Sequence, residues 1–95
     1  MSYAVGEMDG HSVISPEVLA RYAADAAAEV EGVHTKQRRG ARVNGGDVEV
    51  HVVIDYGANI PSVAADVQQH VIDYLVQMAD MRPSLVNVVV DDVMR

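Results

Sequence analysis

The segment from Val48 to Pro61 constrains the fold more than any other part of this sequence. Valine or isoleucine occupies every second position from Val48 to Ile54, and Tyr56 continues the series. This alternation is typical of a strand with one buried face, as antiparallel sheets commonly have. Gly57 then begins a turn, and Pro61 suits the first turn of a helix, where its missing N–H has no intrahelical partner. The segment therefore predicts a strand that leads directly into a helix.

The helix that begins at Pro61 is expected to run to about Ala79, because Arg82-Pro83 stops it. Its apolar positions recur at helical spacing and predict a core-facing stripe. That stripe is expected to contain Ile60, Ala64, Val67, Val71, Tyr74, Leu75 and Met78. A last strand is predicted over Leu85 to Val93, with its core side formed by Val86, Val88 and Val90.

Another helix is predicted near the start of the chain. Ser15 is a good N-cap, Pro16 fits the first helical position, and Gly32 suits the position past the helix end at about Glu31. Ile14 and Leu19 lie at the spacing of a hydrophobic staple. The apolar face of this helix is expected to contain Val18, Leu19, Tyr22, Ala23, Ala26 and Val30.

Two weaker strands complete the prediction. One is a short edge strand from His11 to Ile14, and the other spans Ala41 to Asn44 and ends in a hairpin turn at Gly45-Gly46 or Gly46-Asp47. The resulting order, β-α-β-β-α-β, predicts a single α+β two-layer sandwich. Both helices would pack on one face of a mainly antiparallel, four-stranded sheet. Residues 1–10 are expected to form a flexible arm, and residues 11–95 the single domain.

Composition excludes several kinds of function. The chain has no cysteine, so thiolate catalysis and zinc–sulfur sites are ruled out. A formal net charge of -7 argues against nonspecific binding to DNA or acidic lipid. Residues 1–10 lack the basic region and apolar run of a signal peptide, and no stretch approaches the roughly 20 apolar residues that span a bilayer. A soluble cytoplasmic domain is expected.

No arrangement of residues predicts catalysis, a metal site or a cofactor site. His11, His34, His51 and His70 are scattered, without the spacings of common metal motifs. His51 is expected on the outer sheet face as a surface or interface group. Asp91 and Asp92 are adjacent on a strand, so their side chains should point to opposite faces rather than grip one ion. An enzyme is not expected.

Apolar residues outside the predicted core are candidates for protein contact. On the second helix they form a further strip, Ala65, Ile72, Val76 and Ala79, and on the outer sheet face they are Val53, Val89 and Leu85. Either the core wraps further round the helix, or these residues contact a partner or a second copy. The residues predicted for such contact are Val53, Ile72, Val76 and Val89.

Four of the seven basic residues lie between His34 and Gly46: Lys36, Arg38, Arg39 and Arg42. This stretch could bind RNA or phospholipid headgroups. No aromatic residue interleaves it, so it lacks a stacking platform for bases. The alternative is a solvated loop that offsets an acidic surface.

Two ordered motifs give the sequence a resemblance to a known family. The first is Ile14-Ser15-Pro16-Glu17-Val18, followed by an alanine-rich helix that closes in Glu29-Val30-Glu31-Gly32-Val33; the second is Val48 to Pro61 with Asp55-Tyr56-Gly57 and Asn59-Ile60-Pro61. Together with Val63, Val67, Val71 and Val86-Asn87-Val88, they resemble the bacterial alkaline shock protein family, also described as general-stress or envelope stress response proteins. The connection from Val33 to Val48 is short and basic, where the family often has a longer, more glycine-rich stretch, and no charged tail follows Val93.

The resemblance implies a cytoplasmic protein without enzymatic activity or cofactor, held at the membrane in some members by a separate anchoring protein. We therefore expect a non-enzymatic envelope or general stress response protein that acts through protein–protein contacts, as a homo-oligomer or on a membrane-anchored partner. Two alternatives remain open. One is a small RNA-binding module that uses the basic residues 36–42, and the other is an accessory subunit of a metabolic enzyme.

Overall fold

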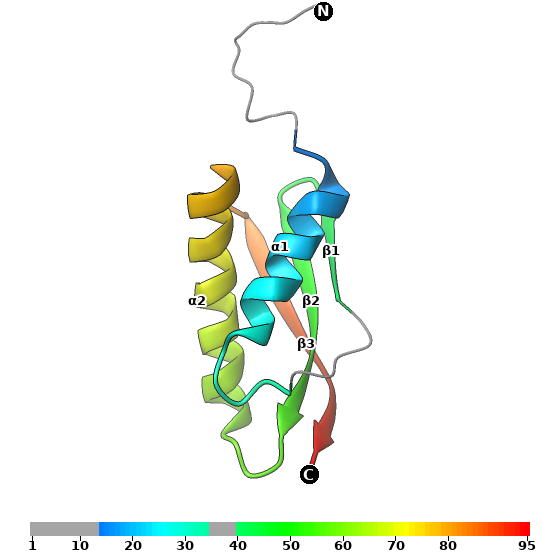
Figure 1. The fold of residues 1–95 in the computed structure, drawn as a ribbon, viewed down its shortest axis with the longest axis vertical. Coiled ribbons are helices and arrows are strands. Elements are labelled where there is room, and N and C mark those ends of the chain that lie inside the picture. Colours follow the sequence, from blue (N-terminus) through cyan, green and yellow to red (C-terminus); the bar gives the residue numbers. More distant parts are fainter. Residues whose placement is uncertain (1–13, 35–39) are drawn as a thin grey trace, which may run out of the picture.

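A computed structural model describes residues 14–34 and 40–95 of the chain. In chain order its elements are α1 (Pro16–Ala28), β1 (Ala41–Asn44), β2 (Asp47–Asp55), α2 (Ile60–Ala79) and β3 (Leu85–Met94). The strands form one sheet in the order β1-β2-β3 (Figure 1). β1 and β2 are antiparallel, whereas β2 and β3 are parallel. The molecule is therefore an α+β domain with a mixed, three-stranded sheet.

The predicted four-stranded, mainly antiparallel sheet and its β-α-β-β-α-β order are wrong for the described residues. Of the expected first strand, residues 11–13 lie outside the described part of the chain, and Ile14 lies in a bend and packs against the core. The parallel pairing follows from the length of α2. Its 20 residues rise about 30 Å, which matches the roughly 30 Å of the nine-residue β2. The chain thus returns to the start of β2, and Leu85 pairs with Asp47.

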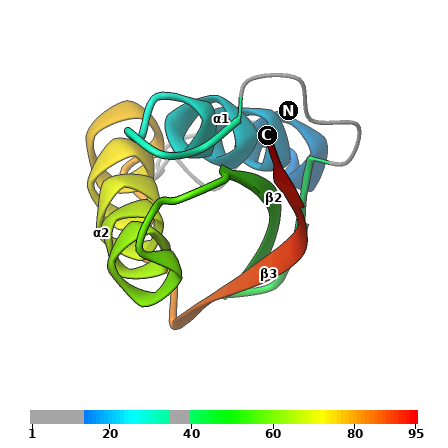
Figure 2. The ribbon, with the colours of Figure 1, turned by 90° about the horizontal axis from the view of Figure 1, so that it is seen from below.

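Both helices cover the same face of the sheet (Figure 2). α1 packs on β1 and β2, α2 packs on β3, and the two helices contact each other. Within the described part of the chain, no helix or strand covers the opposite face. We call this opposite face the outer face.

The core lies between the sheet and the helices. Val48, Val50, Val52 and Ile54 are almost fully buried, which confirms the alternation predicted for β2. Tyr56 does not follow this pattern, because it lies past the end of the strand and is 65% exposed. Its ring instead lies 4.8 Å from the guanidinium carbon of Arg95. On β3, Val86 is buried, and Val88 and Val90 pack against the core, as predicted.

The helical stripes are shifted from those predicted. On α2 the buried residues follow an i, i+4 ridge: Val63, Val67, Val71, Leu75 and Ala79. Ile60 and Met78, both expected in the core, are 40% and 49% exposed, because each lies three residues from a member of this ridge, Val63 or Leu75, and so faces to one side of it. On α1, Ala23, Ala26 and Ala27 are fully buried. Such small side chains let the helix backbone approach its neighbours closely.

The loops are fixed by a few local features. The Ser15 hydroxyl accepts a hydrogen bond from the Val18 N–H (3.2 Å), and the Asn59 side chain accepts one from the Ser62 N–H (3.0 Å), so both helices have the N-caps that their sequences favour. Gly45 has φ +63° in the two-residue turn between β1 and β2. After α1, Val33 forms an isolated antiparallel bridge to Ile54, which extends the β1 side of β2.

Candidate interaction surface

The outer face is formed by the β2 residues that alternate with the core, together with their neighbours on β1 and β3. Glu49 lies opposite Arg42 on one side and Asn87 on the other, and His51 lies opposite Val89. Val53 and Val89 are half-buried there. The surface therefore combines two valines with the carboxylate of Glu49, the guanidinium of Arg42, the amide of Asn87 and the imidazole of His51.

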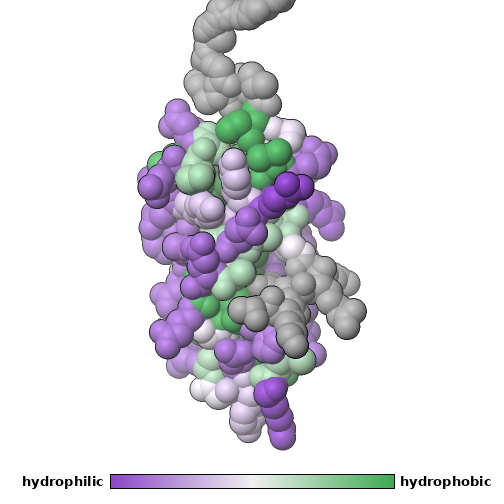
Figure 3. Space-filling model, viewed as in Figure 1, coloured by the Kyte–Doolittle hydropathy of each residue, from purple (hydrophilic) through white to green (hydrophobic). Residues whose placement is uncertain are grey.

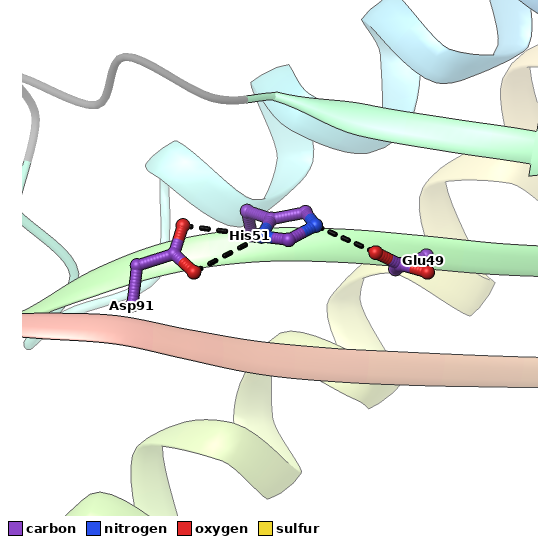
Figure 4. A network of polar contacts seen from close by, with 3 residues as sticks. All are labelled: Glu49, His51 and Asp91. Carbon is purple, nitrogen blue, oxygen red and sulfur yellow. Dashed lines mark hydrogen bonds and ion pairs between the residues drawn. The ribbon is translucent and has the colours of Figure 1, made fainter.

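A polar network joins β2 and β3 on the outer face (Figure 4). His51 Nε2 lies 2.6 Å from Glu49 Oε2, and His51 Nδ1 lies 3.1 Å from both carboxylate oxygens of Asp91. The His51 side chain is only 13% exposed, whereas those of Glu49 and Asp91 are 38% and 29% exposed. Each ring nitrogen of His51 thus faces a carboxylate, that of Asp91 on β3 at one side and that of Glu49 on β2 at the other.

This network sits at an irregularity of the sheet. The pairing of β2 with β3 shifts between Val52 and Val53, so that Val90 pairs with Val52 and Asp92 with Val53. Asp91 is left as the extra residue, and its side chain reaches His51. The sequence pattern placed His51 on the outer face but did not reveal the bulge, because an inserted residue leaves no mark on the alternation of β2.

Asp91 and Asp92 do not form a joint cation site. Asp91 contacts His51, while the Asp92 side chain accepts a hydrogen bond from the Val93 N–H (2.8 Å). Among the residues that the structure describes, no group of three or more His, Asp or Glu side chains is placed to hold a metal ion.

The residues predicted for partner contact fall on two surfaces. Val53 and Val89 lie on the outer face, whereas Ile72 and Val76 lie on α2 in the helical layer. Ile72 is half-buried against the core, and Val76 is 37% exposed. Of the other members of the predicted helical strip, Ala65 is exposed and Ala79 is buried. The strip is therefore partly core and partly surface, and partner contact by its exposed members stays a prediction.

The basic residues are only partly described. Lys36, Arg38 and Arg39 lie outside the described part of the chain. Arg42 is exposed on β1 and lines a hollow of about 240 Å³ on the outer side of the sheet, with Asp47 and Glu49 among the other lining residues. These carboxylates oppose the binding of a phosphate at Arg42 in this hollow.

The helical side carries acidic hollows. One, of about 260 Å³, lies between the helices and includes Glu29, Asp66 and Asp73. His70 Nε2 lies 2.9 Å from Glu29 Oε1 at its edge and ties α2 to the end of α1. Figure 3 shows this side of the molecule, where hydrophilic side chains predominate along α2 and hydrophobic areas are small and separate. The largest apolar side chains left exposed are distributed over several elements.

The fold and its surfaces define a class of protein: a small α+β domain with a helix-covered core and an outer sheet face open for contact. The model of the alkaline shock protein family matches residues 36–95, which is more than half of the chain. The chain therefore belongs to this family, which is described as having a cell envelope-related function. The motif of residues 14–33 precedes the matched region. No curated protein and no solved structure matches the chain. None of the helices in the described residues is long and apolar enough to cross a membrane.

Proposed function

We propose that this protein is a non-enzymatic component of the envelope stress response that works by protein–protein contact. It would act in the cytoplasm, against a membrane-anchored partner or as an assembly of its own copies. The family supplies the connection to the cell envelope. The proposal is carried by one observation, which is that the outer face presents Val53 and Val89 on a rigid sheet that no other described element covers.

The polar network supports contact rather than chemistry at this face. Both ring nitrogens of His51 are held by carboxylates, so neither is free to take a proton from a substrate. The network also fixes β3 against β2 across the bulge, which keeps the valines beside it in place. A partner that docks here would meet apolar groups flanked by hydrogen-bonding groups, as at many transient interfaces.

Affinity capture from the native host tests this proposal. The tagged protein is recovered separately from membrane and soluble fractions, alongside a Val53→Asp variant and a Gln77→Asp control. Gln77 is exposed on α2, so its replacement adds the same charge away from the outer face. We expect a specific protein to be captured by the native chain and the control, and lost or reduced at least about tenfold with Val53→Asp. Equal capture by all three proteins would show that the outer face is not the docking surface.

A further inference from the structure

The outward edge of β3 is open for strand pairing. On β2, the His51 N–H donates to Gly40 O (2.9 Å) and the Val53 carbonyl accepts from the His34 N–H (2.7 Å), so these residues direct their backbone groups toward the β1 side. Because direction alternates along a strand, Val48, Val50 and Val52 face β3. In a parallel pair, the backbone groups of Val48 then form hydrogen bonds with Leu85 and Asn87, the residues on either side of its partner Val86. The backbone groups of Val86, Val88 and Val90 therefore point away from the sheet.

The two ends of this edge are closed by different means. Gln68 of α2 donates its side-chain N–H to the carbonyl of Val86 (3.2 Å). At the other end, the bulge at Asp91 interrupts the regular register. Val88 and Val90 lie between these ends, and within the described residues β3 pairs only with β2. An uncharged, unpaired edge of this kind is a template for another strand.

We propose that a second copy of this chain pairs with this edge, antiparallel, about a twofold axis through Val89. The proposal deepens the proposed function, since it names self-association as one of the contacts through which the protein works. Val88 of each copy would lie opposite Val90 of the other, so that four backbone hydrogen bonds use the outward groups of both residues. In this register Asp92 of the other copy would lie opposite Val86, whose carbonyl Gln68 already occupies, so the new hydrogen bonds are confined to Val88 and Val90.

The side chains of β3 are self-complementary about the same axis. Val89 would meet Val89 of the other copy on the outer face, as a non-hydrogen-bonded pair with Cβ atoms about 4.5–5.5 Å apart. Asn87 would lie opposite Asp91 of the other copy, where its amide can donate to the carboxylate. A twofold axis perpendicular to the sheet produces this antiparallel arrangement and keeps the outer faces of both copies on the same side.

The helical layer supplies a second line of support. α2 is the helix that packs on β3, and Gln68 marks the flank of α2 that faces the open edge. Ile72 and Val76 follow at i+4 and i+8 on that flank. A twofold axis through Val89 brings the α2 helices of the two copies toward each other, so these apolar groups approach the same interface. Isologous pairing of the edge thus gives Ile72, Val76 and Val89 a common role.

Single-cysteine variants test the pairing directly, because the native chain has no cysteine. Val89→Cys and Val53→Cys are oxidised at matched concentrations and separated by non-reducing electrophoresis. Both positions lie on the outer face and are half-buried, but only residue 89 would lie on the axis. We expect a covalent dimer with Val89→Cys at a yield at least about tenfold above that with Val53→Cys. Absence of the dimer with Val89→Cys, or equal yields from both variants, would overturn the pairing.

A second variant acts on the backbone. Val88→Pro removes an outward N–H and leaves the β2–β3 hydrogen bonds in place. We expect the native chain to sediment as a dimer and Val88→Pro to sediment as a monomer with unchanged circular dichroism. A native chain that remains monomeric, or a folded Val88→Pro variant that remains dimeric, would overturn the proposal. If either of these two results is obtained and the native chain still captures a partner protein, the strand pairing is wrong but the proposed function is retained.

Discussion

His51 and Asp91 join the two parallel strands of the sheet at the bulge, with His51 Nδ1 3.1 Å from each carboxylate oxygen of Asp91. The same ring reaches Glu49 from its other nitrogen. This arrangement couples the sequence-local pair Glu49 and His51 to a residue 40 positions later in the chain. It fixes the outer face at the place where the register of β3 changes.

Replacing His51 by Leu should destabilise the fold, because it leaves two partly shielded carboxylates without their shared donor. We expect the free energy of unfolding to fall by about 1–3 kcal/mol, measured by urea denaturation. His70→Leu is the matched control, since its pair with Glu29 is more exposed, with side-chain exposures of 43% and 62%. That change should cost less than about 1 kcal/mol. A larger loss from the control would contradict the structural role given to His51.

Gly32→Ala should be more destabilising than Gly57→Ala, although both glycines have a left-handed φ, +95° and +90°. A Cβ at residue 32 would lie 2.8 Å from Val63 Cγ2, whereas nothing lies within 4 Å of one at residue 57. Each substitution bears the conformational cost of about 1–2 kcal/mol. The steric contact adds to it only at residue 32. Equal midpoints of thermal unfolding for the two variants would show that the Val63 side chain moves away from the new Cβ without loss of stability.

Ala26→Leu should weaken the packing of α1, because Ala26 is fully buried. Overpacking a close contact of this kind costs about 1–3 kcal/mol. Ala28→Leu is the control on the same helix, at a position that is only half-buried. Chemical denaturation of both variants measures the difference. If the two variants lose the same stability, the close approach of α1 does not depend on its small residues.

The sequence predicted β2 and both helices because each is encoded by local periodicity and by its own caps. The register of β3 is different. Whether Leu85 begins beside Asp47 in a parallel pair depends on the length of α2 and on which edge of β2 is free, and neither shows in the alternation of either strand. The prediction of a mainly antiparallel sheet was wrong for this reason.

The candidate contact residues divide in the same way. Alternation along β2 was enough to place Val53 on the outer face. Three other relations depend on how segments distant in the chain meet. They are the separation of Val53 from Ile72, the contact of Asp91 with His51, and the direction of the Val88 backbone groups away from the sheet. Spacing along one element carries no information on these relations.

By itself, the sequence determined the class of fold, the faces of β2, the helix caps and the family to which the chain belongs. Only the tertiary structure decided the parallel pairing of β3, the bulge at Asp91 and the open edge beside it. Local periodicity is set by backbone geometry within a single element, which the order of residues records directly. Strand pairing is set by packing between elements, where the length of α2 and the bulk of the side chains it covers decide the outcome.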